Sequence, residues 1–140
     1  MYQAETFLRV RYAETDKMGV VYHGNFAQYF EVGRVEAIRG LGYSYKDLES
    51  DGIIMPVIEM NTKFVRPAVY DDLITIKTML KDLPNDHRIT FHQEVYNEQG
   101  KLLAFATVVL YFMEAATMTK TTMPTQWKDG LASYFIPLTK

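Results

Sequence analysis

Residues 25–42 read NFAQYFEVGRVEAIRGLG. Small and apolar residues recur in this stretch at spacings of four and three, as they do on one face of an α-helix. Polar and charged residues occupy most of the other positions, and glycines stand at the end. We therefore predict a helix of about four turns that buries one face against another element. The residues of this face are Phe26, Phe30, Gly33, Ala37 and Leu41.

The segments around this helix alternate with the period of two that is typical of β-strands. One predicted strand precedes the helix and four follow it. The last three are joined by short turn segments, so they should be antiparallel neighbours. A long helix facing a large antiparallel sheet buries its apolar face only if the sheet curls around it. This order predicts an α+β hot-dog fold with about five strands. The predicted strands are 7–12, 54–65, 73–81, 88–96 and 102–113.

Helix-capping signals refine the prediction. Asn25 is expected to cap the long helix, with Gln28 three residues further on. Two short helices are expected besides the long one. The first covers 45–49 and is capped by Ser44, and the second lies within 124–135, with Trp127 and Leu131 on one side.

The composition excludes several functional classes. The chain has 140 residues, of which 48% are hydrophobic and 23% charged, and this suits a single domain over 1–140 with its own core. A net charge of -2 and the lack of Lys or Arg runs argue against a nucleic-acid partner. The most apolar run, 104–113, is too short to span a bilayer. No signal segment is evident and cysteine is absent, so we expect a cytoplasmic protein.

No motif indicates a serine or cysteine nucleophile, a metal or a nucleotide cofactor. The three serines lie outside a G-x-S-x-G context, and the three histidines lack metal-binding spacing. Glycine-rich cofactor or phosphate loops are also missing. We therefore expect neither metal nor cofactor. A carboxylate helped by a helix end and a histidine remains for hydrolysis or proton transfer.

The loop that precedes the long helix, AETDKMGVVYHGNF at 13–26, contains such a carboxylate. Backbone N–H groups near His23 and Gly24 lie at the positive end of the helix, where an oxyanion is stabilised. Asp16 would attack the carbonyl that forms this oxyanion, or activate a water toward it. The spacing leaves a second interpretation open, in which Asp16 forms a turn and His23 is an ordinary loop residue. Glu31 and Arg34 are most simply an ion pair on the flank of the helix.

The same loop and helix carry a resemblance to a known family. The run TDKMGVVYHGNF, followed by YFEVGRVE, resembles the signature of hot-dog acyl-CoA thioesterases of the 4-hydroxybenzoyl-CoA thioesterase type, in particular those associated with the Tol-Pal system. The resemblance covers about 7–114, including an F-x-R-P-A pattern at 64–68 and an A-x-A run at 104–106, and leaves a tail at 115–140. It implies an enzyme that hydrolyses an acyl-CoA to a free acid and CoA.

The resemblance also implies roles for individual residues. Asp16 matches the essential carboxylate, which is a nucleophile or a general base toward the thioester. His23 falls where the backbone N–H polarises the thioester carbonyl, so its side chain is secondary. Gly19 would let the loop pass close to the substrate, and Asn25 would cap the helix beside the acyl site. Further substrate contacts are expected at Val20 and Tyr22. Because CoA carries phosphates, its binding site needs exposed cations, and Arg66 is a candidate from the recognised motif. Arg88 and Lys120 are candidates from their position alone, with solvated charges at strand ends as the alternative.

The family forms dimers by pairing sheets edge to edge, often with a dimer of dimers. The resemblance therefore implies a homodimer or homotetramer with active sites at the subunit interface.

Two alternative functions remain open. A hot-dog dehydratase of hydroxyacyl thioesters would use His23 with Glu31, and a non-catalytic acyl-CoA-binding module would be expected to lack the loop carboxylate.

Overall fold

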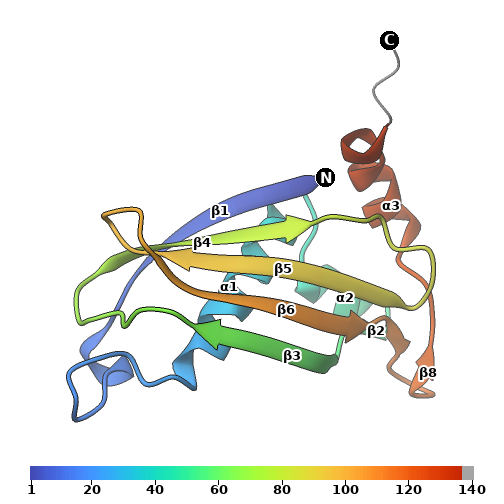
Figure 1. Cartoon of the computed structure of the whole chain (residues 1–140). Coiled ribbons are helices and arrows are strands. Elements are labelled where there is room, and N and C mark those ends of the chain that lie inside the picture. Colours follow the sequence, from blue (N-terminus) through green and yellow to red (C-terminus); the bar gives the residue numbers. More distant parts are fainter. Residues whose placement is uncertain (137–140) are drawn as a thin grey trace.

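The main sheet contains five antiparallel strands in the order β1–β4–β5–β6–β3 (Figure 1). The structure is a computed structural model that describes residues 1–136. The predicted antiparallel neighbours β4, β5 and β6 are confirmed, and β1 and β3 form the two edges. The strands are β1 Tyr2–Arg9, β3 Val57–Phe64, β4 Leu73–Leu80, β5 Arg88–Tyr96 and β6 Leu102–Tyr111.

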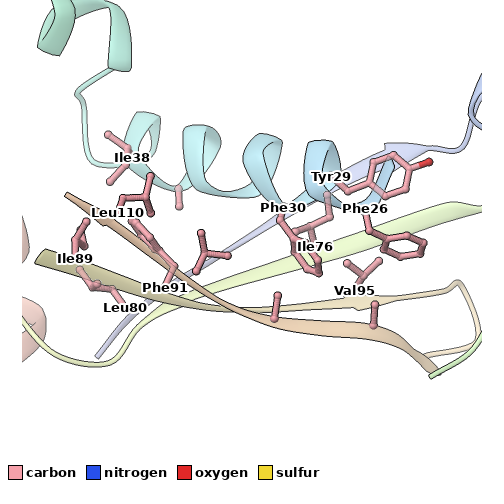
Figure 2. Close-up of a cluster of buried hydrophobic side chains, with 14 of the residues drawn as sticks. Phe26, Tyr29, Phe30, Ile38, Ile76, Leu80, Ile89, Phe91, Val95 and Leu110 are labelled. Atoms are coloured by element: carbon pink, nitrogen blue, oxygen red, sulfur yellow. The ribbon is translucent and has the colours of Figure 1, made fainter. Parts of the chain in front are cut away.

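The long helix α1, Asn25–Arg39, lies across one face of this sheet (Figure 2). Its apolar side chains pack on those of the strands, so the predicted hot-dog fold is confirmed. Gly33 is required for the close approach, because a Cβ there would lie 2.6 Å from Ile76 Cγ2. The core between helix and sheet includes Phe26, Phe30, Ala37, Ile38, Ile76, Phe91, Val95 and Leu110.

Several predicted strand limits are wrong, each for a local reason. The first strand ends at Arg9, because Tyr12–Glu14 turns as a 3₁₀ helix, η1. The segment predicted as one strand at 54–65 is divided into β2, Ile53–Ile54, and β3, since Pro56 between them has no N–H for a ladder.

A second, three-stranded sheet was not predicted. It has the order β2–β7–β8, with β7 at Met113–Glu114 and β8 at Thr119–Lys120. The predicted strand at 102–113 therefore belongs to both sheets, with β6 in the main sheet and β7 in the small one. Strands of two residues carry too little alternation to be recognised from sequence.

The two short helices were predicted correctly. Helix α2, Tyr45–Ser50, is capped by Ser44, whose Oγ accepts a hydrogen bond from the Asp47 N–H at 3.1 Å. Helix α3, Thr125–Ala132, buries Trp127 and Leu131 on one side, and the 3₁₀ turn η2, Ser133–Phe135, follows it.

The predicted ion pair between Glu31 and Arg34 is wrong. Arg34 is only 4% exposed and turns inward, where its Nη1 donates to Gln93 Oε1 at 3.1 Å. Gln93 Nε2 in turn donates to the Phe30 carbonyl at 2.8 Å and to Thr78 Oγ1 at 2.9 Å. A polar network thus lies inside the apolar layer between α1 and the sheet.

Candidate active site

The loop before α1 folds into a small hairpin. The Asp16 N–H donates to the Val20 carbonyl at 2.9 Å, and the Tyr22 N–H donates to the Glu14 carbonyl at 2.9 Å. At the turn, Asp16 Oδ1 accepts from the Met18 N–H at 2.8 Å, and Gly19 adopts a positive φ of 79° that favours glycine. Asp16 therefore does form a turn, and within residues 1–136 its second carboxylate oxygen, Oδ2, accepts no hydrogen bond.

Glu14 anchors this hairpin, and the sequence analysis missed it. Its buried carboxylate accepts from the Tyr29 hydroxyl at 2.9 Å and from the Arg11 N–H at 2.8 Å. Burial alone would raise the pKa of Glu14, but hydrogen bonds from Arg11 and Tyr29 outweigh burial and lower it. The pKa of Tyr29 is raised by burial, and also by its hydrogen bond to the Glu14 carboxylate and the negative charge of that group. Glu14 thereby connects the hairpin to the first turns of α1.

Asn25 does not cap α1, contrary to the prediction. The capping position is Gly24, and Asn25 is the first helical residue. Its Nδ2 instead donates to the Glu14 carbonyl at 2.8 Å. This carbonyl therefore accepts from Asn25 and from the Tyr22 N–H, and these two bonds fix the start of the helix to the hairpin.

Two backbone N–H groups at the start of α1 remain available. The Asn25 N–H donates to the Tyr22 carbonyl, and the Phe26 N–H donates to the His23 carbonyl. In the described part of the chain, neither the His23 N–H nor the Gly24 N–H has an acceptor. Both lie at the positive end of the helix, where a developing negative charge on oxygen is stabilised.

A cavity of about 270 Å³ opens beside these N–H groups. Most of its walls are apolar, and the His23 ring lies 6.0 Å from the Phe64 ring. Arg66 also lines it, with its Nη1 donating to the Leu102 carbonyl at 2.8 Å. The lining residues are Val21, His23, Phe26, Phe64, Val65, Arg66 and Pro67.

The predicted site residues fall into two groups. The hairpin residues gather at this end of the molecule with Arg66, since Val20 forms a bridge with Val69 and the Tyr22 ring lies 4.5 Å from the His23 ring. The second group consists of Arg88 and Lys120, which lie elsewhere.

Within one chain, these two cations lie far from the hairpin. Arg88 pairs with Tyr111 at the end of β6, whereas Phe64 pairs with Ala104 near its beginning. Lys120 Nζ lies 5.3 Å from the centre of the Tyr111 ring. The fold thus places both cations at the other end of the sheet, and their predicted role in binding CoA stays a prediction.

The arrangement suits attack on a carbonyl. One hairpin and the helix after it carry a partly exposed carboxylate, with one oxygen that accepts no hydrogen bond within residues 1–136, and two N–H groups that have no acceptor there. The apolar cavity adjoins them at His23, and Asp16 does not line it. No three histidine, aspartate or glutamate side chains of the described residues are grouped as a metal site.

None of the helices within 1–136 has the length and apolar character needed to cross a membrane. The predicted cytoplasmic location stays a prediction.

Comparisons with known proteins agree with this geometry. Residues 18–104 match the family model of the thioesterase superfamily. The putative acyl-CoA thioesterase YneP of Bacillus subtilis (strain 168) is 36% identical over 107 residues, covering 76% of this chain and 77% of the relative. The acyl-CoA thioester hydrolase YbgC of Escherichia coli O6:H1 is 28% identical over 117 residues, or 84% of this chain and 87% of the relative.

Among solved structures, the DHNA-CoA thioesterase from Staphylococcus aureus superposes with a TM-score of 0.90 at 34% identity, covering 96% of this chain and 91% of that one. The family model covers more than half of the chain, and YneP matches about three quarters of it at over 30% identity. The chain therefore belongs to the thioesterase superfamily.

Proposed function

We propose that this protein hydrolyses the thioester bond of an acyl-CoA, releasing a free acid and CoA, with Asp16 as the reactive carboxylate. The observation that carries the proposal is that the N–H groups of His23 and Gly24 have no acceptor among residues 1–136 and follow a hairpin whose Asp16 carboxylate has one oxygen without a hydrogen bond in the same residues. The names of its relatives, acyl-CoA thioesterase and thioester hydrolase, support the substrate class.

The reaction can follow either of two routes. In the first, an Asp16 oxygen attacks the thioester carbonyl carbon, the C–S bond breaks, and the CoA thiolate leaves and is protonated. Water then hydrolyses the resulting anhydride, which releases the free acid and restores the Asp16 carboxylate. In the second, Asp16 removes a proton from a water that attacks the same carbon, and the CoA thiolate leaves and is protonated. In both routes the carbonyl oxygen becomes negative and accepts from the His23 and Gly24 N–H groups.

The dehydratase alternative is less well supported. It requires His23 and Glu31 to act together, but His23 precedes α1 and Glu31 lies about 9 Å along the helix axis beyond Asn25. The binding-module alternative predicts that the loop carboxylate is missing, whereas Asp16 is present.

We further propose a homodimer formed through β3. This strand is an edge of the main sheet, and an unpaired edge is a ready site for a further strand. Apolar side chains are exposed on it and just after it, and antiparallel pairing would bring the Arg88 end of one copy toward the Phe64 end of the other. Arg88 and Lys120 would then approach the partner's cavity. The exposed apolar residues are Val57, Ile58, Phe64 and Val65.

The substitution Asp16→Asn tests the assignment. Asparagine can still accept from the Met18 N–H, so the turn is kept while the nucleophile or base is removed. We expect kcat with an acyl-CoA panel to fall at least about 100-fold, the low end of what such a group supplies.

Asp86→Asn is the matched control, because Asp86 Oδ1 accepts from the Arg88 N–H at 2.8 Å in the same kind of turn. Its turnover should stay within about twofold of the original. If Asp16→Asn hydrolysed acyl-CoA as fast as this control, with unchanged circular dichroism, Asp16 would not be the reactive group.

A further inference from the structure

The hairpin before α1 carries two carboxylates, and the one on Glu14 is not available to a substrate. Glu14 is buried, and both of its oxygens accept hydrogen bonds. Its Oε1 accepts from the Tyr29 hydroxyl and the Arg11 N–H, and its Oε2 accepts from the Arg11 guanidinium at 3.2 and 3.3 Å. Asp16, two residues further on, is partly exposed and has one oxygen that accepts no hydrogen bond within residues 1–136. Glu14 therefore has a role other than attack on a carbonyl.

Among the side-chain contacts of Glu14, the one with Tyr29 is the strongest. The Arg11 side chain is 76% exposed, and an ion pair on the surface contributes little. Tyr29 is buried in the first turns of α1 (Figure 2), and its hydroxyl donates to the ionised Glu14 carboxylate at 2.9 Å. A hydrogen bond to a charged group is roughly twice as strong as one between neutral groups. The bond to Tyr29 is thus the main side-chain link between Glu14 and the rest of the chain.

Helix α1 holds Glu14 at two separate points. Asn25 Nδ2 donates to the Glu14 carbonyl at 2.8 Å, and the Tyr29 hydroxyl donates to the Glu14 carboxylate. Asn25 and Tyr29 are four residues apart, so they lie on one side of the helix and about 6 Å apart along its axis. A single contact would let the hairpin rotate about it. Two separated contacts fix its direction as well as its position.

The direction of the hairpin determines where Asp16 lies relative to the start of the helix. Asp16 belongs to the same arm of the hairpin as Glu14, and its N–H donates to the Val20 carbonyl of the other arm at 2.9 Å. The Tyr22 N–H donates to the Glu14 carbonyl at 2.9 Å, and the next residue is His23. Glu14 is therefore bonded both to the arm that leads to His23 and to the helix, while its own arm carries Asp16.

We propose that Glu14, through its bond to Tyr29, is a positioning residue that aligns the Asp16 carboxylate with the N–H groups of His23 and Gly24. This inference rests on the proposed function of Asp16. A displacement of about 1 Å at a reacting group can lower a rate by about 100-fold, so a residue that does not touch the substrate can still determine kcat.

Tyr29→Phe tests the proposal, because it removes the hydroxyl and keeps the ring in the core. We expect kcat with an acyl-CoA to fall about tenfold while KM changes by less than about twofold, since the lost bond aligns the reacting groups and does not bind the substrate. The assay is run well below the unfolding temperature of the variant, and circular dichroism at the same temperature verifies that the chain is folded.

Tyr2→Phe is the matched control, since it deletes another buried tyrosine hydroxyl that is bonded to α1. The Tyr2 hydroxyl donates to the Ala37 carbonyl, near the other end of this helix. Both substitutions should lower the unfolding temperature, but Tyr2→Phe should keep kcat within about twofold of the original. No fall in kcat for Tyr29→Phe, or an equal fall in both variants, would overturn the proposal.

The double variant Asp16→Asn with Tyr29→Phe shows whether the effect passes through Asp16. With the carboxylate already removed, Tyr29→Phe should lower the remaining kcat by less than about twofold, because two groups that act as a unit are not additive. A further tenfold loss in this background would overturn the positioning role.

Failure of this inference can be distinguished from failure of the proposed function. An active Tyr29→Phe beside a slow Asp16→Asn rejects only the positioning role. Full activity of Asp16→Asn rejects the reactive carboxylate, and the positioning role with it.

Discussion

His23 and Gly24 offer a test that separates backbone from side-chain chemistry at the start of α1. If their N–H groups stabilise the oxyanion, His23→Ala keeps the amide and should lower kcat/KM by about tenfold at most. Gly24→Pro deletes an N–H and constrains the preceding residue, so it should cost considerably more. Steady-state kinetics on both variants, with circular dichroism to verify folding, measure the difference.

Gly24→Ala is the control for the proline variant, because it keeps the N–H while adding a side chain. A Cβ at this position would lie 2.7 Å from Tyr22 Cε2, but this ring is half exposed and can move. Gly24→Ala should therefore be much more active than Gly24→Pro. A loss in His23→Ala as large as that in Asp16→Asn would instead make the imidazole a catalytic group.

The residues that sequence analysis proposed for the site are those whose relevant neighbours lie close to them in the sequence. Asp16 and His23 lie in one short loop next to a predicted helix start, so their neighbourhood can be read along the chain. Glu14 could not be found in this way, because its partner Tyr29 reaches it only after α1 has formed. Arg34 was misjudged for a similar reason, since its partner Gln93 belongs to a distant strand.

At the scale of elements, Glu14 fastens the hairpin to α1, and its ionisation should make this contact depend on pH. Its pKa is lower in the folded chain than the usual 4.5, so its ionised form stabilises the fold above that value, and the stabilisation is lost as pH falls through the lowered pKa. We expect Glu14→Gln to lower the free energy of unfolding by about 1–3 kcal/mol at pH 7. Urea titrations should show the difference shrinking below about pH 4.

The control for this prediction is Glu5→Gln, which removes an exposed carboxylate from β1 and should leave the unfolding free energy within about 0.5 kcal/mol. A loss of stability in Glu14→Gln that stayed constant down to pH 3 would show that the hydrogen bonds to Glu14 do not depend on its charge.

Periodicity was sufficient for the central elements and insufficient at their boundaries. The periodic pattern of apolar residues extends over many positions in helix α1 and in strands β4, β5 and β6. The predicted limits of these elements differ from the observed ones by only a few positions. The errors lie where a local event interrupts the pattern, such as Pro56 or the η1 turn. Tertiary contacts determine where the elements end at these places, and the periodicity of the sequence carries no information about such contacts.

At the scale of the whole molecule, a charge on the outer edge of β3 should prevent the proposed dimer. Ile58 is 49% exposed on this strand, and Ile58→Lys would require two buried ammonium groups at a paired edge. We expect this variant to sediment as a monomer. Its activity should fall as well, because Arg88 and Lys120 would no longer approach a partner's cavity.

Phe7→Lys provides the matched control on the opposite edge of the sheet, where Phe7 in β1 is 62% exposed. This variant should keep the oligomeric state of the original chain in analytical ultracentrifugation. If Ile58→Lys and Phe7→Lys gave the same mass, β3 would not be the dimer interface.

The strand order also has a consequence for how the chain matures during synthesis. Strand β1 leaves the ribosome before the other described strands, but its neighbour β4 begins only at Leu73, whereas β4, β5 and β6 follow one another through short turns. Closing a long loop costs more entropy than closing a short one, so the three consecutive strands can assemble before β1 joins them. The hairpin with Asp16 is held by a hydrogen bond from Val21 to Ala68 and by the Val20–Val69 bridge, so it reaches its final position only after these later residues have been made. A nascent chain interrupted before β4 has emerged would already contain every proposed catalytic residue and still lack the framework that aligns them.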